Sequence, residues 1–273
     1  MPELPDLEVL KANLTPRIVD RTVRGVEVRS PAFLKTVTPP LAELVGRRAV
    51  GVDRRGKYLL LLFQGGLRFI IHLMRWGWIW HGSSSYAPTR ATLFRLALDD
   101  GMDVRVIESG SQRLARGWLL AGDAPGPEAG LGLEPLDPEF TLEAFRQVLS
   151  GKRRQLKRLL VDQKLIAGIG NAYADEILFQ ARLSPFRYSH TLDDGEVVRL
   201  HQAIPDTLRW AIGEIRNRLG GELFEREVRD FLWVHGRVGK PCRVCGTPIE
   251  EVLLGGQRTD YCPLCQNVNR PLT

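Results

Sequence analysis

The first three residues, Met1-Pro2-Glu3, are the part of the sequence best suited to covalent chemistry. An initiator methionine is normally removed when a small residue follows it, and removal would leave a secondary amine on Pro2. An α-amino group titrates near pH ~8, so a useful fraction is neutral and can attack a carbonyl-like carbon to form a Schiff base. Glu3 could donate a proton once burial raises its pKa. On its own, however, such a tripeptide is usually just the start of a chain.

The second chemical feature is a set of four cysteines near the C-terminus. They form two Cys-x-x-Cys pairs, Cys242 with Cys245 and Cys262 with Cys265, separated by sixteen residues. Each pair can sit on a tight knuckle and supply two thiolates to a tetrahedral zinc ion. Four cysteines leave no open coordination position, so we expect one structural zinc ion. A redox dithiol is the less favoured alternative.

Composition sets the class of protein. A chain of 273 residues with 44% hydrophobic content can form one large domain or two ordinary ones. The sequence contains neither a run of about 18 apolar residues nor a signal-peptide pattern, so we expect a soluble intracellular protein without a membrane segment. The net charge of +6 suits a polyanionic partner. Because acidic residues are also numerous, a binding face requires segregation of charge.

The elements that would hold these residues differ between the two halves. Leu7, Leu10 and Leu14 predict a helix over residues 5–14 that ends before Pro16 and fixes the N-terminal amine. An alternating pattern follows, with turn signals between its runs, and indicates an antiparallel sandwich or barrel. The predicted strands cover residues 23–28, 57–63, 67–80, 92–98 and 102–107.

The second half has a helical pattern. Residues 122–138 are rich in Gly and Pro and predict an interdomain linker. Further on, the segment Ala167-Gly168-Ile169-Gly170-Asn171 interrupts two helices, and Asn171 could cap the second. A helix N-terminus is a ready phosphate site, and Lys152 and Arg153 add positive charge upstream. Taken alone, this turn is a weak signal, and a basic helix is usually only a solvated face.

Three longer strings make the sequence recognisable. Residues 1–8 read MPELPDLE, residues 162–179 read DQKLIAGIGNAYADEILF, and the approach to the first cysteine pair reads VHGRVGKPCRVCG. Together they closely resemble the formamidopyrimidine-DNA glycosylase and endonuclease VIII family, and the resemblance covers the whole chain. That family excises oxidised bases from DNA and cuts the strand with its N-terminal proline. The sequence is identified as a divergent member.

The resemblance implies a fold and a set of site residues. The expected fold class is α+β: an N-terminal antiparallel β-sandwich with a short N-terminal helix, and a C-terminal helix–two-turn–helix domain with a zinc finger. The expected boundaries are 1–121 for the catalytic domain, 122–138 for the linker, 139–234 for the helical domain and 235–273 for the zinc finger. The catalytic residues would be Pro2, Glu3, Lys57 and Arg258. The DNA-binding residues would be His72, Arg75, Arg113, Lys152, Arg153, Asn171 and Gln257.

Several positions depart from the family pattern. Asp6 replaces a glutamate, and Arg75 stands where the family has a methionine wedge that enters the DNA stack. The aromatic residue that fills the gap left by the flipped base is missing from residues 109–117. In the zinc hairpin, Gln257 replaces an arginine, and Arg258 is its neighbour.

Three alternating tryptophans are an addition to this pattern. Trp76, Trp78 and Trp80 would share one face of a regular strand. They would form either a half-buried sheet face or a platform on which unpaired bases stack.

The function expected from the resemblance is that of a bifunctional DNA glycosylase and abasic-site lyase of base excision repair. The partner would be damaged DNA, duplex or single-stranded, bound by a monomer in the bacterial cytoplasm, associated with the nucleoid. The altered wedge keeps two alternatives open. One is a structure-specific or non-catalytic DNA-binding protein, and the other is a lyase with weak glycosylase activity that prefers abasic or single-stranded DNA.

Overall fold

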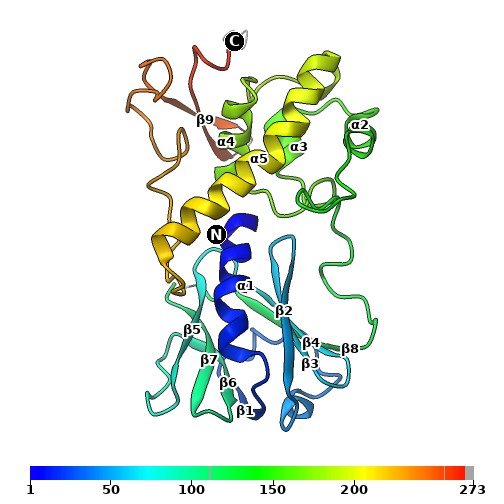
Figure 1. The fold of residues 1–273 in the computed structure, drawn as a ribbon, viewed down its shortest axis with the longest axis vertical. Helices are drawn as coiled ribbons and strands as arrows, with labels where there is room; N and C mark the ends of the chain where they lie inside the picture. Colours follow the sequence, from blue (N-terminus) through cyan, green and yellow to red (C-terminus); the bar gives the residue numbers. More distant parts are fainter. Residues whose placement is uncertain (111, 255, 268–273) are drawn as a thin grey trace. The chain divides into compact units, whose positions relative to one another are not determined.

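The computed structural model of the protein describes residues 1–110, 112–254 and 256–267. The chain forms two compact units, shown in Figure 1. The first contains Met1–Ala129 together with Ile215–Val228, and the second contains Gly130–Glu214 together with Arg229–Thr273. Each unit is therefore built from two separate segments of sequence.

The first unit is a sandwich of two four-stranded antiparallel sheets. The strands of one sheet, in spatial order, are β1 (Val23–Val28), β6 (Thr92–Leu98), β7 (Met102–Glu108) and β5 (Gly77–Ser83). Those of the other are β2 (Ala49–Arg55), β3 (Tyr58–Phe63), β4 (Leu67–His72) and β8 (Arg116–Ala121). A short 3-10 turn, η1 (Leu41–Leu44), precedes β2. Apolar side chains from both sheets meet in one buried core, where Phe69 stacks on Phe94.

Helix α1 (Leu4–Ile18) opens the chain and packs against β2 and β3, as Figure 1 shows. Its leucines at 7, 10 and 14 are buried in the sandwich core, as predicted. The helix does not end before Pro16, and that expectation was wrong. Proline costs one backbone hydrogen bond inside a helix, but the next turn brings the fully buried Ile18 into the core.

The strand prediction needs two further corrections. The run over residues 67–80 is two strands, β4 and β5, which belong to different sheets. A turn separates them, with Met74 in the left-handed region at φ 55° and the Gly77 N–H bonded to the Leu73 carbonyl. Strands β2 and β8 were not predicted, because neither Ala49–Arg55 nor Arg116–Ala121 alternates cleanly in sequence.

The second unit is helical and carries a β-hairpin. Its helices are α2 (Leu142–Leu149), α3 (Leu156–Leu160), α4 (Asn171–Gln180), the short η2 (Ser189–Thr191) and α5 (Asp194–Leu219), whose last residues count with the first unit. The hairpin pairs β9 (Glu250–Leu254) with β10 (Gln257–Tyr261), and β10 packs against α4. The hairpin expected in the zinc finger is present, although Gly255 lies outside the described residues.

The cysteine-bearing segment is joined to the helices through an apolar cluster. Cys242 and Cys262 are buried beside Phe179 of α4, Val234 and Ile249. These units together confirm the predicted α+β fold class. Within the described residues, no helix has the length and apolar character needed to cross a membrane.

Candidate active site and zinc centre

The N-terminus of α1 is held by reciprocal bonds at its first turn. The Asp6 carboxylate accepts the backbone N–H of Glu3 at 2.8 Å, and the Glu3 side chain faces the Asp6 N–H in the return half of a capping box. Pro2, Glu3 and Asp6 are all buried. Because Asp6 performs this role, the shorter side chain at the position where the family has glutamate still fixes the start of the helix.

Lys57 lies beside this helix start, in the turn between β2 and β3 rather than within a strand. Its side chain is almost fully buried. Burial lowers the pKa of the Lys57 ammonium, while the charges of Glu3 and Asp6 act in the opposite direction. One buried cation therefore faces two buried carboxylates at the start of α1.

His72 ends β4 and faces the same group of charges. Burial, together with the positive charges of Lys57 and Arg116, lowers its pKa to about 4. The ring is therefore neutral at pH 7. Its Nδ1 accepts the Met74 N–H at 3.1 Å, which leaves the hydrogen on Nε2, where it can be donated.

A cavity of about 540 Å³ opens beside Pro2 in the first unit. Its wall includes Arg75 and Trp76 from the β4–β5 turn and the segment from Phe224 to Glu227. The ammonium of Met1 forms an ion pair with Glu227 at 2.7 Å across this wall. Pro2 thus lies at the edge of a space within the size range of ligand pockets.

The β4–β5 turn separates the three tryptophans. Trp76 lies before β5 and is 63% exposed, and its ring faces Gly110 of the following loop. Trp80 instead lies under the guanidinium of Arg105, 4.4 Å from the ring centroid. Trp78 is half-buried, so Trp76 is the one of the three that solvent reaches freely.

Residues 109–117, which contain no aromatic residue, form the loop after β7 and the start of β8. Ser111 in this loop lies outside the described residues. Trp76 was not among the expected site residues, although its ring is next to this loop. The signal that could have found it is its place beside Arg75 in a turn. Arg113, which follows in the same loop, donates to the carbonyl of Arg90.

In the second unit, the two turns between α3 and α4 are held by one amide. Gln163 donates to the carbonyls of Val161 and Ile169 and accepts the Gly168 N–H. Asn171 does not cap α4, contrary to expectation: Gly170 is the N-cap and Asn171 is the first helical residue. The buried Oδ1 of Asn171 has no hydrogen-bond partner among the described residues.

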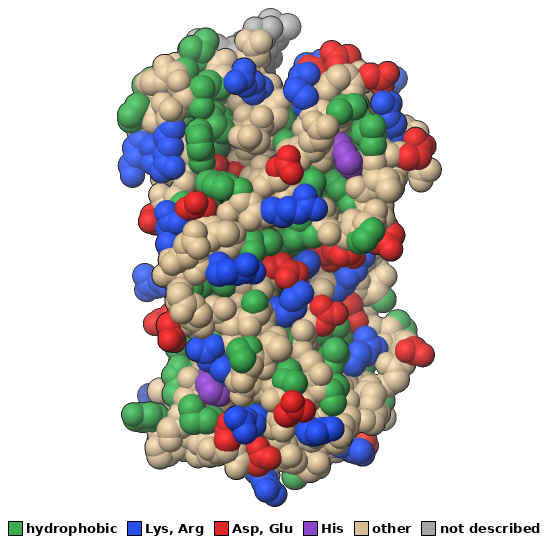
Figure 2. Space-filling view, in the orientation of Figure 1, with side chains coloured by type: hydrophobic (Ala, Val, Ile, Leu, Met, Phe, Trp, Pro, Cys, Tyr) green, Lys and Arg blue, Asp and Glu red, His purple; other side chains and the backbone are tan. Residues whose placement is uncertain are grey.

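The remaining residues predicted to bind DNA lie at two places in the second unit. Lys152 and Arg153 line a shallow cavity near Ser189. On the face shown in Figure 2, basic and acidic side chains are interspersed rather than segregated. Gln257 and Arg258 are adjacent on β10, and both are exposed to solvent.

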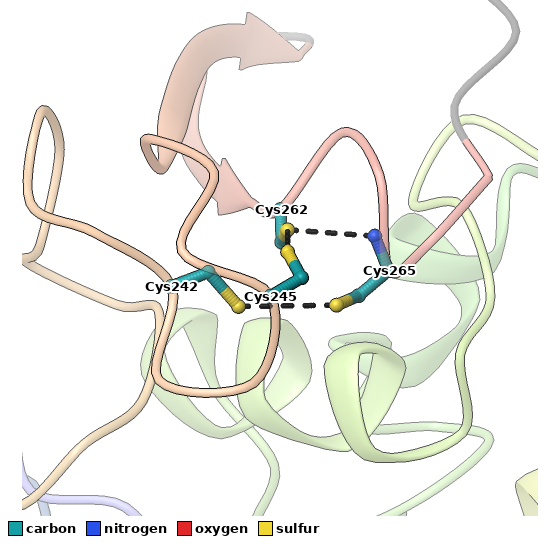
Figure 3. A group of neighbouring side chains, drawn as sticks. All are labelled: Cys242, Cys245, Cys262 and Cys265. Carbon is teal, nitrogen blue, oxygen red and sulfur yellow. Dashed lines mark hydrogen bonds between the residues drawn. The ribbon is translucent and has the colours of Figure 1, made fainter.

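The four cysteines meet in one group, drawn in Figure 3. The Sγ atoms of Cys242 and Cys265 are 3.8 Å apart and those of Cys245 and Cys262 are 3.5 Å apart. These separations are too long for disulfides but close to the edge of a tetrahedron with Zn–S bonds of about 2.3 Å. The donor set therefore fits one structural zinc ion.

Comparison with known proteins identifies the family. The sequence model of the formamidopyrimidine-DNA glycosylase N-terminal domain matches residues 1–111, and that of the formamidopyrimidine-DNA glycosylase H2TH domain matches residues 131–219. The zinc finger found in FPG and IleRS matches residues 239–268. The chain belongs to the formamidopyrimidine-DNA glycosylase family.

Individual relatives agree with these matches. The chain is 38% identical to the formamidopyrimidine-DNA glycosylase of Symbiobacterium thermophilum, over 98% of this chain and 90% of that protein. The crystal structure of MutM (Fpg) from Thermus thermophilus has a TM-score of 0.83 and 34% identity, covering 98% of this chain and 100% of that one. A complex of Lactococcus lactis Fpg with DNA containing an abasic site has a TM-score of 0.87 and 27% identity, covering 97% and 100%.

These matches confirm the predicted family, fold class and zinc finger. Pro2, Glu3, Lys57 and His72 lie in one group in the first unit, with Arg75 at the cavity beside it. Their roles, and those of the DNA-binding residues, stay predictions.

The zinc centre yields a first prediction. Cys262→Ser should release the metal and lower the stability of the second unit, because the ion ties the two cysteine pairs to each other. Metal content and thermal unfolding measure both effects. The matched control is Val244→Ser, which changes an exposed residue between Cys242 and Cys245 and should keep one zinc per chain. Retention of the metal by the Cys262 variant would contradict the four-cysteine site.

A second prediction concerns His72 and pH. Its pKa is about 4 in the folded chain against 6.5 for the free side chain, so between these values the unfolded chain binds a proton that the folded chain does not. The contribution of His72 to the free energy of unfolding is fully present above pH 6.5. It should decrease as the pH falls towards 4, by up to roughly 3 kcal/mol. His72→Gln should flatten that fall in urea unfolding at pH 7.0 and 4.5. Identical pH dependence in the two proteins would rule out the buried neutral ring.

Proposed function

We propose that this protein is a bifunctional DNA glycosylase and abasic-site lyase of base excision repair, which acts on oxidised bases through a Schiff base on Pro2. The observation that carries the proposal is the position of Pro2 at the edge of the 540 Å³ cavity, next to the buried Glu3, whose carboxyl group interacts with the buried Lys57. Family membership supports the same reaction class. Relatives solved with DNA containing an abasic site or carbocyclic 8-oxo-G support DNA as the partner.

The reaction follows from these groups. The Pro2 nitrogen attacks C1′ of an extruded nucleotide, and the base leaves with its bonding electrons and takes up the proton that the Pro2 nitrogen loses. Glu3 donates a proton to the sugar ring oxygen, so that the ring opens to an iminium ion. The iminium makes the C2′ proton acidic, and its loss expels the 3′-phosphate by β-elimination.

The neighbouring residues assist through charge. Lys57 stabilises the carboxylate that Glu3 becomes once it has donated its proton, and it also faces the Asp6 carboxylate. The neutral ring of His72 can donate from Nε2 to a phosphate oxygen without the cost of burying a further cation.

The second unit supplies phosphate contacts in this proposal. Asn171 is the first residue of α4, where its side-chain NH₂ can donate to a phosphate oxygen and the helix start offers backbone N–H groups. Arg258 on the hairpin supplies a cation, 46% exposed at its side chain. Binding that depends on such contacts weakens as salt rises.

The preference between duplex and single-stranded DNA is proposed to depend on the β4–β5 turn. Arg75 must lose hydration to enter the base stack, which disfavours extrusion from intact duplex. Trp76, exposed at the same turn, offers a ring on which a base can stack, worth ~1–3 kcal/mol per contact. The preference for abasic or single-stranded DNA therefore stays a prediction, with Trp76 as the residue that would support it.

The nucleophile can be tested by borohydride, which reduces an iminium to a stable amine. The protein should form a covalent complex with abasic DNA, and Pro2→Gly should greatly weaken it. A form with Met1 retained and acetylated should give none, because its proline nitrogen is an amide. Undiminished trapping by the acetylated form would contradict the Pro2 assignment. If the unmodified protein binds DNA but gives no covalent complex, the non-catalytic alternative is favoured.

A separate test addresses Glu3. Glu3→Gln should lose base excision more than cleavage of a pre-formed abasic site, by a factor on the order of 10²–10⁴, because the acid is needed most while the base is attached. Single-turnover rates on an 8-oxoguanine duplex and on an abasic duplex give the comparison. Glu43→Gln changes an exposed glutamate elsewhere in the first unit and serves as the control. Equal losses on both substrates would exclude this role for Glu3.

A further inference from the structure

A cluster of buried charges lies in the second unit and contains none of the zinc ligands. Asp175 on α4 and Asp260 on β10 are each 1% exposed, and Lys157 on α3 is equally buried. His235, in the segment before the first cysteine pair, completes the group. Four separate elements of the unit thus place ionisable side chains at one point.

The cluster has the spacing of a metal site but not its electrostatics. Ligand atoms of Asp175, His235 and Asp260 lie within 4.8 Å of one another. The Lys157 ammonium, however, is 2.5 Å from Oδ1 of Asp175. An added cation would therefore meet a positive charge already in place, and the group is better described as a hydrogen-bonded charge network.

The network contacts Arg258 at its backbone carbonyl and at its guanidinium. Lys157, paired with Asp175, donates to the backbone carbonyl of Arg258 at 2.6 Å. The other oxygen of Asp175 accepts from His235 Nδ1 at 2.8 Å and from the backbone N–H of Asp260 at 3.3 Å. The Asp260 carboxylate in turn accepts from Arg258 Nε at 3.1 Å. Arg258 is thus held at its backbone and at its guanidinium.

The Asp260 carboxylate is itself fixed from a second direction. The backbone N–H of Gly236 donates to its Oδ2 at 2.6 Å. Glu251, across the hairpin, also pairs with the Arg258 guanidinium. A long side chain loses rotamer freedom when it binds a phosphate, and prior restraint by neighbours reduces that loss.

We infer that Asp175 and Asp260 are positioning residues that pre-orient Arg258 for a DNA phosphate. Helix α4 then carries residues for two tasks: Asn171, at its start, would contact phosphate, and Asp175, one turn later, would help to orient Arg258. This inference rests on the proposed function, since it assumes that Arg258 contacts DNA.

The sign of the effect separates positioning from simple charge. Asp175→Asn and Asp260→Asn each remove a negative charge, and general electrostatics predicts tighter binding to a polyanion. Positioning predicts the reverse: weaker binding, on the order of tenfold, because a charge-assisted hydrogen bond is lost or misaligned. The probe is a duplex with a tetrahydrofuran abasic analogue, which cannot form a Schiff base.

The experiment is a double-mutant cycle with Arg258→Ala, with zinc content and thermal unfolding measured for each variant. The weakening caused by either aspartate variant should disappear in the Arg258→Ala background. Asp194→Asn is the matched control, since it removes one charge from an exposed ion pair with Arg146 in the same unit and should not weaken binding.

The remaining outcomes decide against the inference. Unchanged or tighter binding by Asp175→Asn and Asp260→Asn, or weakening that persists without Arg258, overturns it. If Asp175→Asn does not fold because Lys157 loses its counter-charge, Asp260→Asn alone decides the question. If Arg258→Ala binds like the parent protein, the proposed DNA contact of Arg258 fails as well. If Arg258→Ala weakens binding while the aspartate variants do not, only the positioning inference fails.

Discussion

The bond between the Glu3 N–H and the Asp6 carboxylate is the constraint on which the first unit's site depends. It stops the chain from fraying at the point where the reactive amine must stay within reach of a substrate carbon. The same carboxylate, with Glu3, offsets the burial of the Lys57 ammonium. Local helix geometry and site electrostatics therefore share the same atoms, and neither can be altered without the other.

In the second unit, the β-hairpin must also be held in place. This hairpin has only two strands, and a lone hairpin is marginal in water. Two attachments compensate: the cysteine cluster, and the contacts of β10 with α4. Glu176, next to Asp175 on α4, accepts the backbone N–H groups of Trp233, Val234 and His235. Adjacent carboxylates on one helix thus fix both the hairpin and the segment leading to it.

Much of this could be predicted from sequence, because long strings with fixed spacing carry it. The opening octapeptide, the two-turn segment around Asn171 and the cysteine pairs are each specific. What escaped prediction depended on contacts far apart in sequence. Strand β2 lacks an apolar alternation of its own and forms because β3 pairs with it. His235 lies in a recognisable string and Asp260 does not, but neither position indicates a contact with Asp175, which depends on the packing of the second unit.

The two-segment construction of the first unit has a consequence for dissecting the protein. Phe224 belongs to the sandwich core, although it lies more than one hundred residues beyond the end of β8 in the sequence. A fragment that ends at Ala129 would lack Phe224. The complementary fragment would carry Ile215–Val228, whose apolar side chains would have no sandwich core to pack against. Recombination that exchanges one whole unit between relatives must therefore replace two separate stretches of sequence. A single crossover cannot exchange the sandwich without also exchanging part of the helical unit.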